Sequence, residues 1–160
     1  MVREKSVGAV IFHNQANQVR YLLVQYRHGV WEFVRGHVEG HETEHHTAVR
    51  EIREETGLRG LTFIPGFRQT RSWTFTNYYH KRVRKEVVYF LAETKKTSVQ
   101  LDDENLAFSW LPFRSAQTRL SYPPSKVILK SAHQFLMLHH NKQRVYARRS
   151  LAGDHPKSKR

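Results

Sequence analysis

Apolar residues gather in short runs along most of the chain, and polar stretches separate these runs. Residues 6–12 are apolar on both faces, which predicts a strand in the middle of a sheet. Residues 68–80 alternate between aromatic and basic side chains, and this alternation is typical of an edge hairpin. The remaining apolar runs predict strands over residues 21–24, 31–34, 61–67 (broken at Pro65-Gly66), 83–93 and 108–111.

Two segments have a helical pattern. Residues 44–56 contain neither Gly nor Pro, with Thr43 as a suitable N-cap and Gly57 suited to the left-handed C-terminal position. A second helix is predicted over residues 126–139, with Ser125 as its N-cap. Its buried stripe would contain Ile128, Ala132, Phe135, Leu136 and His139. Strands before, between and after two helices predict an α/β (α+β) fold, a mixed β-sheet sandwiched between α-helices.

The periodic pattern ends near residue 140. The sequence therefore predicts one domain over residues 1–140, large enough for a substantial core, followed by a basic tail over residues 141–160. The tail holds seven Lys or Arg residues and one Asp, and we expect it to be flexible.

Charge and composition narrow the range of partners. Lys and Arg number 27 against 14 Asp and Glu, so the formal net charge is +13. This excess favours nucleotides and other polyanions, including RNA bound through the basic surface or the tail. The chain has no Cys, which excludes thiolate metal sites. No apolar run approaches the ~20 residues of a membrane span, and the charged N-terminus lacks a secretory pattern, so we expect a cytoplasmic protein without membrane contact.

The helix predicted over residues 44–56 carries an unusual acidic face. Glu51, Glu54 and Glu55 share one side because they are three and four positions apart, and Arg50 can reach Glu54. Clustered carboxylates repel one another, and a hard divalent cation such as Mg²⁺ or Mn²⁺ would make the cluster favourable while bridging to phosphate. The preceding loop can fold back and add Glu42 or a backbone carbonyl. The alternative is a solvated helix face.

The same region contains a second motif. His41-Glu42-Thr43-Glu44-His45 matches the H-E-x-x-H pattern of zinc peptidases. That site requires one uninterrupted helix through both His residues, whereas Thr43 is predicted to cap the helix between them. No third ligand is evident further along the chain, so we reject this interpretation.

Residues 36–58 follow a longer pattern: Gly, five residues, Glu, seven residues, Arg-Glu, an apolar residue, any residue, Glu-Glu, any residue, Gly and an apolar residue. This spacing resembles the signature box of the Nudix hydrolases at every position. A chance match is on the order of one in a hundred million per start position. The resemblance implies the Nudix fold and metal-assisted attack of water on a phosphorus atom.

The flanking residues resemble the dinucleoside tetraphosphate hydrolases within that family. Trp31, residues 85–93 (KEVVYFLAE) and residues 104–110 (ENLAFSW) are similar to segments of that group, although Val34 and Arg35 stand where it has Pro and Lys. The implied reaction is asymmetric cleavage of a dinucleoside tetraphosphate to a nucleoside triphosphate and a monophosphate. Two alternatives stay open: removal of pyrophosphate or a cap from RNA 5′ ends, and a non-catalytic module that binds nucleotides or RNA.

The resemblance also implies roles for individual residues. Glu51, Glu54 and Glu55 would hold divalent metals together with the Gly36 carbonyl, and Arg50 would orient the carboxylates. The general base would be Glu51, Glu54 or Glu104, where Glu104 fits a plain surface acid equally well.

Other residues are candidates for binding the substrate. The cations expected at the remaining phosphates are Arg35, Lys85 and Lys81, with a solvent-facing strand position as the alternative for Lys85. The aromatic side chains available to stack on a base are Tyr78, Tyr79 and Tyr122, each of which equally fits a packing role.

Overall fold

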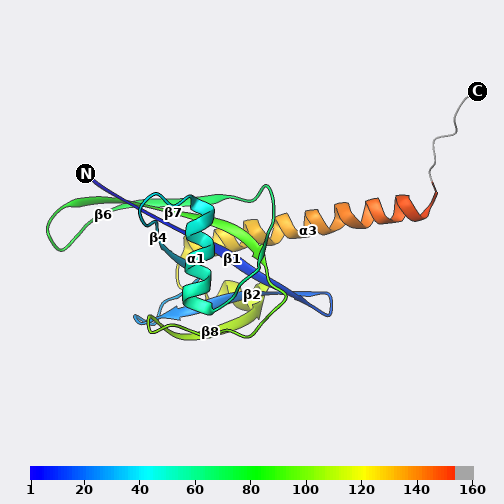
Figure 1. Cartoon of the computed structure of the whole chain (residues 1–160), viewed down its shortest axis with the longest axis horizontal. Helices are drawn as coiled ribbons and strands as arrows, with labels where there is room; N and C mark the ends of the chain where they lie inside the picture. Colours follow the sequence, from blue (N-terminus) through cyan, green and yellow to red (C-terminus); the bar gives the residue numbers. More distant parts are fainter. Residues whose placement is uncertain (154–160) are drawn as a thin grey trace, which may run out of the picture.

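The structure is a computed structural model that describes residues 1–153. Within these residues, eight strands form one mixed sheet with helices on both faces, as the sequence predicts (Figure 1). None of the described helices has the length and apolar character needed to span a membrane. The elements in chain order are β1 (Val2–Gln15), β2 (Gln18–Tyr26), β3 (Trp31–Glu32), β4 (Val34–His37), α1 (Glu44–Thr56), β5 (Thr62–Phe63), β6 (Gln69–Thr76), β7 (Arg82–Glu93), β8 (Asn105–Pro112), α2 (Phe113–Arg119) and α3 (Pro123–Leu151).

Strand β1 occupies the centre of the sheet, as predicted from its two apolar faces. Residues 6–12 are all buried. The strand pairs in parallel with β7 and antiparallel with β2 and β4. Strand β6 pairs with β7 as an antiparallel hairpin, so residues 68–80 supply one strand and the turn of the predicted hairpin.

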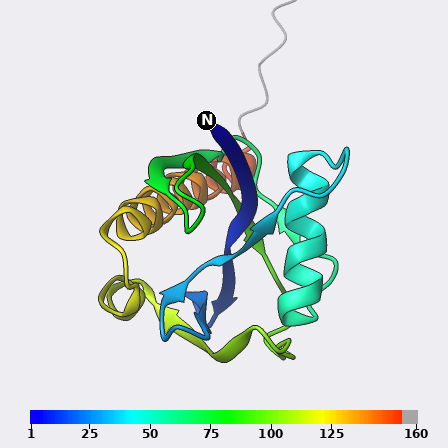
Figure 2. The ribbon, with the colours of Figure 1, turned by 90° about the vertical axis from the view of Figure 1, so that its left-hand side faces the viewer.

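Figure 2 shows α1 on one face of the sheet and α2 and α3 on the other, and each face contributes side chains to a separate core. On one face, Tyr21, Leu23 and Tyr89 pack against buried residues of α2 and α3. On the other face, Ile11 and Val24 pack with Ile52 of α1 and its neighbours. The alternation of side chains along each strand thus supplies both cores, and it leaves α1 alone on its side of the sheet.

Helix α3 differs most from the prediction. It begins at Pro123 instead of residue 126, and it continues to Leu151 instead of ending at His139. Residues 141–151 of the predicted flexible tail are therefore helical, while residues 154–160 lie outside the described part of the chain. The physical reason is that no Gly or Pro interrupts the chain between Pro124 and Gly153, so a helix can continue without an apolar stripe.

Several shorter boundaries also move. The strand predicted over 31–34 is divided into β3 and β4, the strand predicted over 61–67 keeps only Thr62–Phe63, and β8 begins before residue 108. Helix α2 was not predicted, since its seven residues lack a side-chain cap. Ser125, the predicted N-cap of the second helix, is instead buried in the first turn of α3, where its hydroxyl donates to Glu32.

Candidate active site

Helix α1 presents the acidic residues, and its two ends are defined by local sequence. The Thr43 hydroxyl accepts a hydrogen bond from the His46 backbone amide at 3.2 Å, and Gly57 ends the helix in the left-handed conformation (φ 72°), as predicted. Because Thr43 caps the helix, His41 lies before it and cannot join His45 in a zinc-binding pair. His45 instead packs on Phe63, with 4.4 Å between ring centroids.

Gly36 on β4 allows the backbone to lie directly against the carboxylate of Glu51. A Cβ at Gly36 would lie 1.9 Å from Glu51 Cδ and 2.1 Å from its Oε1. The antiparallel pairing of β4 with β1 places Gly36 opposite Val7, which holds this part of the backbone in the sheet. Only glycine permits this approach, because any side chain would displace the carboxylate.

Arg50 links the acidic residues to the loop before the helix. Its guanidinium donates to Glu42 Oε1 at 2.6 Å, to Glu51 Oε1 at 2.9 Å and to Glu54 Oε2 at 3.1 Å. It also donates to the His37 carbonyl at 2.8 Å. The predicted contact between Arg50 and Glu54 is thus confirmed. One arginine fixes two carboxylates of α1 and ties the helix to the end of β4.

Glu55 is the most buried acid of the group, with 2% of its surface exposed. Burial, together with the nearby charges of Glu51, Asp102 and Glu104, raises its pKa to about 8, although the Tyr26 hydroxyl donates to it at 3.1 Å. Glu55, Asp102 and Glu104 can each direct an oxygen to within 4.8 Å of the others. A buried acid beside two others is unfavourable by itself and becomes favourable beside a cation.

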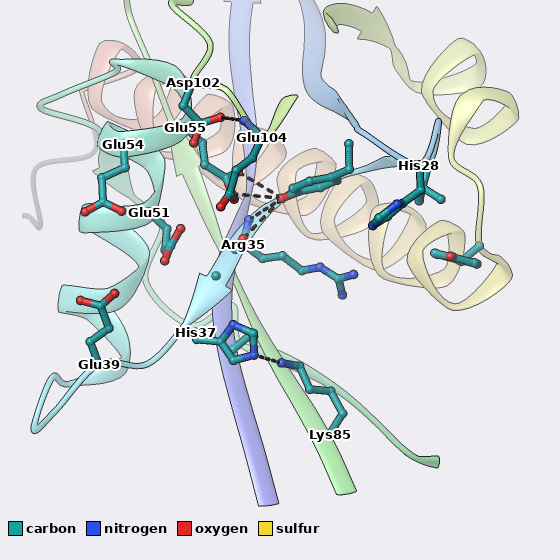
Figure 3. Close-up of a pocket in the computed structure, with 15 residues that line it drawn as sticks. His28, Arg35, His37, Glu39, Glu51, Glu54, Glu55, Lys85, Asp102 and Glu104 are labelled. Atoms are coloured by element: carbon teal, nitrogen blue, oxygen red, sulfur yellow. Dashed lines mark hydrogen bonds between the residues drawn. The ribbon is translucent and has the colours of Figure 1, made fainter. Parts of the chain in front are cut away.

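A cleft of about 520 Å³ opens over these acids (Figure 3). Glu51, Glu54 and Glu55 line it from α1, while Asp102 and Glu104 line it from the loop before β8. Arg35, His37 and Lys85 lie on the β4 and β7 side, and Glu39, His28 and Tyr122 are also among the lining residues. Negative and positive groups therefore face the same space from different elements.

The two cations of the cleft are held in different ways. Arg35 donates to the Tyr89 hydroxyl at 3.3 Å, so its guanidinium is anchored at the sheet surface. Lys85 Nζ lies 2.7 Å from His37 Nε2 and 3.4 Å from Glu4 Oε2. Burial lowers the pKa of Lys85 from its usual value. Both side chains are thus positioned before any ligand arrives.

The sequence profile of the NUDIX domain matches residues 2–132, most of the chain. The chain belongs to the Nudix family. It is a Nudix hydrolase, and the residues of the signature box meet the loop acids and the cleft cations in one place.

Two curated relatives and one solved structure are similar over most of their lengths. The asymmetrical bis(5′-nucleosyl)-tetraphosphatase of Mus musculus is 34% identical over 144 residues, which cover 82% of this chain and 95% of that protein. The enzyme of the same name from Sus scrofa is 33% identical with the same coverage. The crystal structure of a C. elegans Ap4A hydrolase binary complex aligns with a TM-score of 0.74 and 27% identity, covering 84% of this chain and 98% of that one.

The structure brings most of the predicted Nudix site residues into the cleft lining and leaves five outside it. One of the five is Arg50, which donates to the lining residues Glu51 and Glu54. Glu42 is held by Arg50 and by the Thr47 hydroxyl, which donates to it at 2.7 Å, and it does not line the cleft. The hydrogen bonds from Arg50 and Thr47 lower the pKa of Glu42 to about 2. The other three residues, Tyr78, Tyr79 and Lys81, lie in the β6–β7 turn, away from the cleft lining.

The Nudix cleft also contains residues that the sequence analysis did not select. Asp102 stands two positions before Glu104 in an acidic run, and this run is a sequence feature from which Asp102 could have been predicted. Tyr26, by contrast, is the last residue of β2 and His28 lies in the turn after it, and neither has a distinguishing sequence pattern. Only the pairing of β2 with β3 and β8 brings them beside Glu55 and Tyr122.

The acids of the cleft fit a hard divalent cation. All of the candidate ligand atoms are oxygens, which Mg²⁺ and Mn²⁺ prefer. The absence of a side chain at Gly36 leaves its backbone beside the Glu51 carboxylate. The buried Glu55 also lies close to Asp102 and Glu104, and a bound cation would offset the repulsion between these carboxylates.

Proposed function

We propose that this Nudix hydrolase cleaves a dinucleoside tetraphosphate asymmetrically, giving a nucleoside triphosphate and a nucleoside monophosphate. The observation that carries the proposal is the meeting of six acids with Arg35 and Lys85 in one cleft. A polyphosphate needs cations along its length and a metal at the point of cleavage. The similarity to tetraphosphatases over 95% of their length supports the choice of substrate.

Glu51, Glu54 and Glu55 are the residues that would hold a divalent ion, together with the carbonyl of Gly36. Such an ion, when bound, neutralises phosphate charge and activates water. Arg50 keeps Glu51 and Glu54 in fixed positions, so little reorganisation is needed on binding. The position of Glu42 beneath Arg50 supports a role in orienting that arginine in place of direct metal binding.

Glu104 is our candidate for the general base. It is exposed at the mouth of the cleft, close enough to accept a proton from water beside Glu55. The water oxygen forms a bond to phosphorus, the bridging P–O bond breaks, and the departing phosphate leaves as an anion. Glu51 and Glu54 are less available for proton transfer, because both already accept hydrogen bonds from Arg50.

Arg35 and Lys85 would bind the phosphates that are not cleaved. The forked guanidinium of Arg35 suits two phosphate oxygens at once, while Lys85 acts as a point charge. His28 and Tyr122 offer planar rings in the lining of the cleft, where a nucleobase can stack. Tyr122 is the predicted tyrosine that lies in the cleft, which favours it over Tyr78 and Tyr79.

The decisive experiment is turnover of diadenosine tetraphosphate with Mg²⁺, with products separated by anion-exchange chromatography. We expect equal amounts of ATP and AMP, and no turnover in excess EDTA. Release of two ADP, or no turnover by the folded protein, would overturn the substrate assignment. Triphosphorylated RNA serves as the comparison substrate, because the charge of +13 also suits a 5′-triphosphate end. Faster turnover of that RNA would indicate that the 5′ ends of RNA are the substrate of the cleft.

A further inference from the structure

The second half of α3 extends beyond the body of the domain (Figure 1). Its last buried residue is Leu136, and every residue from 141 to 151 is exposed. At 1.5 Å per residue, the segment after Leu136 is about 22 Å long. We call residues 137–151 the arm. Because residues 141–151 are all exposed, packing against the core does not explain why this part of the arm is helical.

The arm carries positive charge without any compensating acid. Four exposed cations lie along it, Lys142, Arg144, Arg148 and Arg149, and the sequence has no Asp or Glu from residue 105 to residue 153. No salt bridge among the described residues involves these four cations. Arg144 and Arg148 are also four positions apart, where like charges destabilise a helix. A polyanion would relieve this repulsion.

The distribution of side chains around the arm distinguishes between kinds of polyanion. Val145 lies on the same face as Lys142 and Arg149, three and four positions away. Leu151 likewise follows Arg148 by three positions on another face. Cationic and apolar residues are therefore mixed on each side, whereas a helix that lies on a membrane separates its apolar face from its charged one. A second copy of the chain would bring like charges together and is disfavoured as well.

An anion-compatible groove lies at the base of the arm. It has a volume of about 520 Å³ and is situated where the β1–β2 turn meets α3. Asn14 and Asn17 line it from the turn, and His140, Asn141 and Arg144 line it from the helix. These side chains offer hydrogen-bond donors beside a cation, which suits phosphate and sugar oxygens. Arg144 belongs to both the groove and the arm, so the two adjoin.

We propose that the arm and this groove bind single-stranded nucleic acid through its phosphate backbone. Tyr146, which is 74% exposed in the middle of the arm, provides a ring on which an unpaired base can stack. This surface is separate from the catalytic cleft. Tyr122 lines the cleft at the start of α3, and Arg144 follows it by 22 residues, about 33 Å along the helix axis. The arm would therefore tether the enzyme to nucleic acid without presenting a strand for hydrolysis.

The test measures binding of a fluorescent single-stranded oligouridylate with a 5′ hydroxyl, which offers the cleft no terminal phosphate. The arm variant replaces Lys142, Arg144, Arg148 and Arg149 with Gln in the full chain. Its matched control replaces four exposed cations outside both surfaces with Gln and has the same net charge. The control positions are Arg59, Lys95, Lys96 and Arg114.

We expect the arm variant to bind at least tenfold more weakly than the control. The slope of log affinity against log salt concentration should fall by about 3, since about 0.7 is lost for each phosphate contact. Tyr146→Ala should bind about tenfold more weakly, in proportion to one lost stacking contact. Gln is a good helix former, so circular dichroism should show the same helix content in all variants.

Equal affinity of the arm and control variants would overturn the proposal. Binding of the wild type to phosphatidylserine vesicles, with no binding of the oligonucleotide, would overturn it in favour of a membrane surface. Both variants should hydrolyse diadenosine tetraphosphate at the wild-type rate, because none of the substituted residues lines the cleft. Loss of binding with retained hydrolysis therefore separates this proposal from the proposed reaction.

Discussion

Gly36 determines how closely the backbone of β4 approaches the carboxylates of α1. We expect Gly36→Ala to lower the hydrolysis rate by roughly 100-fold, because the new methyl group would force the Glu51 carboxylate to move by more than an ångström. Steady-state kinetics with diadenosine tetraphosphate checks this. His41→Ala is the control in the loop after β4, since His41 is exposed and does not line the cleft. A Gly36→Ala enzyme with more than half of the wild-type rate would contradict the prediction.

Glu55 combines a functional position with a cost to stability. We expect Glu55→Gln to lose activity by at least 100-fold, since one oxygen ligand and its charge disappear. Without metal at pH 7, the same variant should melt at a higher temperature than the wild type. Glu55, whose pKa is raised to about 8, must take up a proton to be buried beside Asp102 and Glu104, whereas Gln is already neutral.

Thermal melting in EDTA and in Mg²⁺ measures this second effect. Mg²⁺ should raise the melting temperature of the wild type and have little effect on Glu55→Gln. Asp103→Asn changes a neighbouring acid outside the cleft lining and should behave like the wild type. An equal Mg²⁺ shift in Glu55→Gln would exclude Glu55 as a ligand.

At the scale of elements, α1 is attached to the sheet by an ion-pair cluster near its N-terminus. Glu44, in the first turn, accepts two hydrogen bonds from Arg68, at 2.7 and 2.8 Å, and one from Lys5 at 2.7 Å. The hydrogen bonds from Arg68, followed by those from Lys5, lower the pKa of Glu44 to about 2. Three segments distant in sequence are thereby connected at one carboxylate.

This pKa predicts a pH dependence of stability. A carboxyl with a lowered pKa stabilises the fold above its ordinary value of 4.5, and that contribution disappears as the pH falls towards 2. Glu44→Gln should reduce the free energy of unfolding by about 1 kcal/mol at pH 7, allowing for solvent screening. The difference from wild type should vanish near pH 2. Urea unfolding between pH 2 and 7 measures it, with Glu86→Gln as the control, and a difference independent of pH would contradict the prediction.

The limits of α1 could be predicted from sequence, whereas those of α3 could not. Thr43 and Gly57 act through their own backbone and side-chain chemistry, so local sequence is sufficient to identify them. The extension of α3 past His139 depends on helix propensity without any periodic apolar pattern. A method based on hydrophobic periodicity ends such a helix where burial ends, close to Leu136.

At the scale of the whole molecule, Glu32 joins three elements in the interior. It is fully buried on β3, accepts hydrogen bonds from Arg71 of β6 and Ser125 of α3, and lies under the cleft wall that contains Tyr122. Arg71 also lies over the Tyr122 ring, with 5.4 Å from its Cζ to the ring centroid. The network connects the start of α3 with the edge strands β3 and β6 of the sheet.

Removing Glu32 should therefore be strongly destabilising. Glu32→Ala leaves the Arg71 guanidinium in a mostly buried position without its carboxylate, and we expect a loss of about 3–5 kcal/mol in the free energy of unfolding. Ser125→Ala removes two hydrogen bonds of the same network, the one donated to Glu32 and the one accepted from Arg71, and should cost about 1–2 kcal/mol. Chemical denaturation measures both. A loss below about 1 kcal/mol for Glu32→Ala would show that the network is not a source of stability.

The acidic residues of the cleft could be predicted from the sequence more completely than the other residues that line it. Glu51, Glu54 and Glu55 are close together in one helix, so their proximity follows from helical spacing alone. His28 and Tyr122 meet only through strand pairing and the position of α3, which are long-range properties. The same limit applies to Tyr78 and Tyr79, the predicted stacking residues that lie outside the cleft lining. No feature of the sequence shows in which direction the turn that carries them projects.

The parallel pairing of β1 with β7 has a consequence for how the chain folds. Val2 pairs with Val83 and Phe12 with Glu93, so the central ladder closes across 81 residues. During synthesis on a ribosome, the apolar residues 6–12 stay without their partner strand β7 until most of the domain has been synthesised. Local hairpins such as β1–β2 can form first, whereas the ladder requires a slow, long-range closure. We expect this step to limit the folding rate and to be the stage at which the nascent chain is most prone to aggregation.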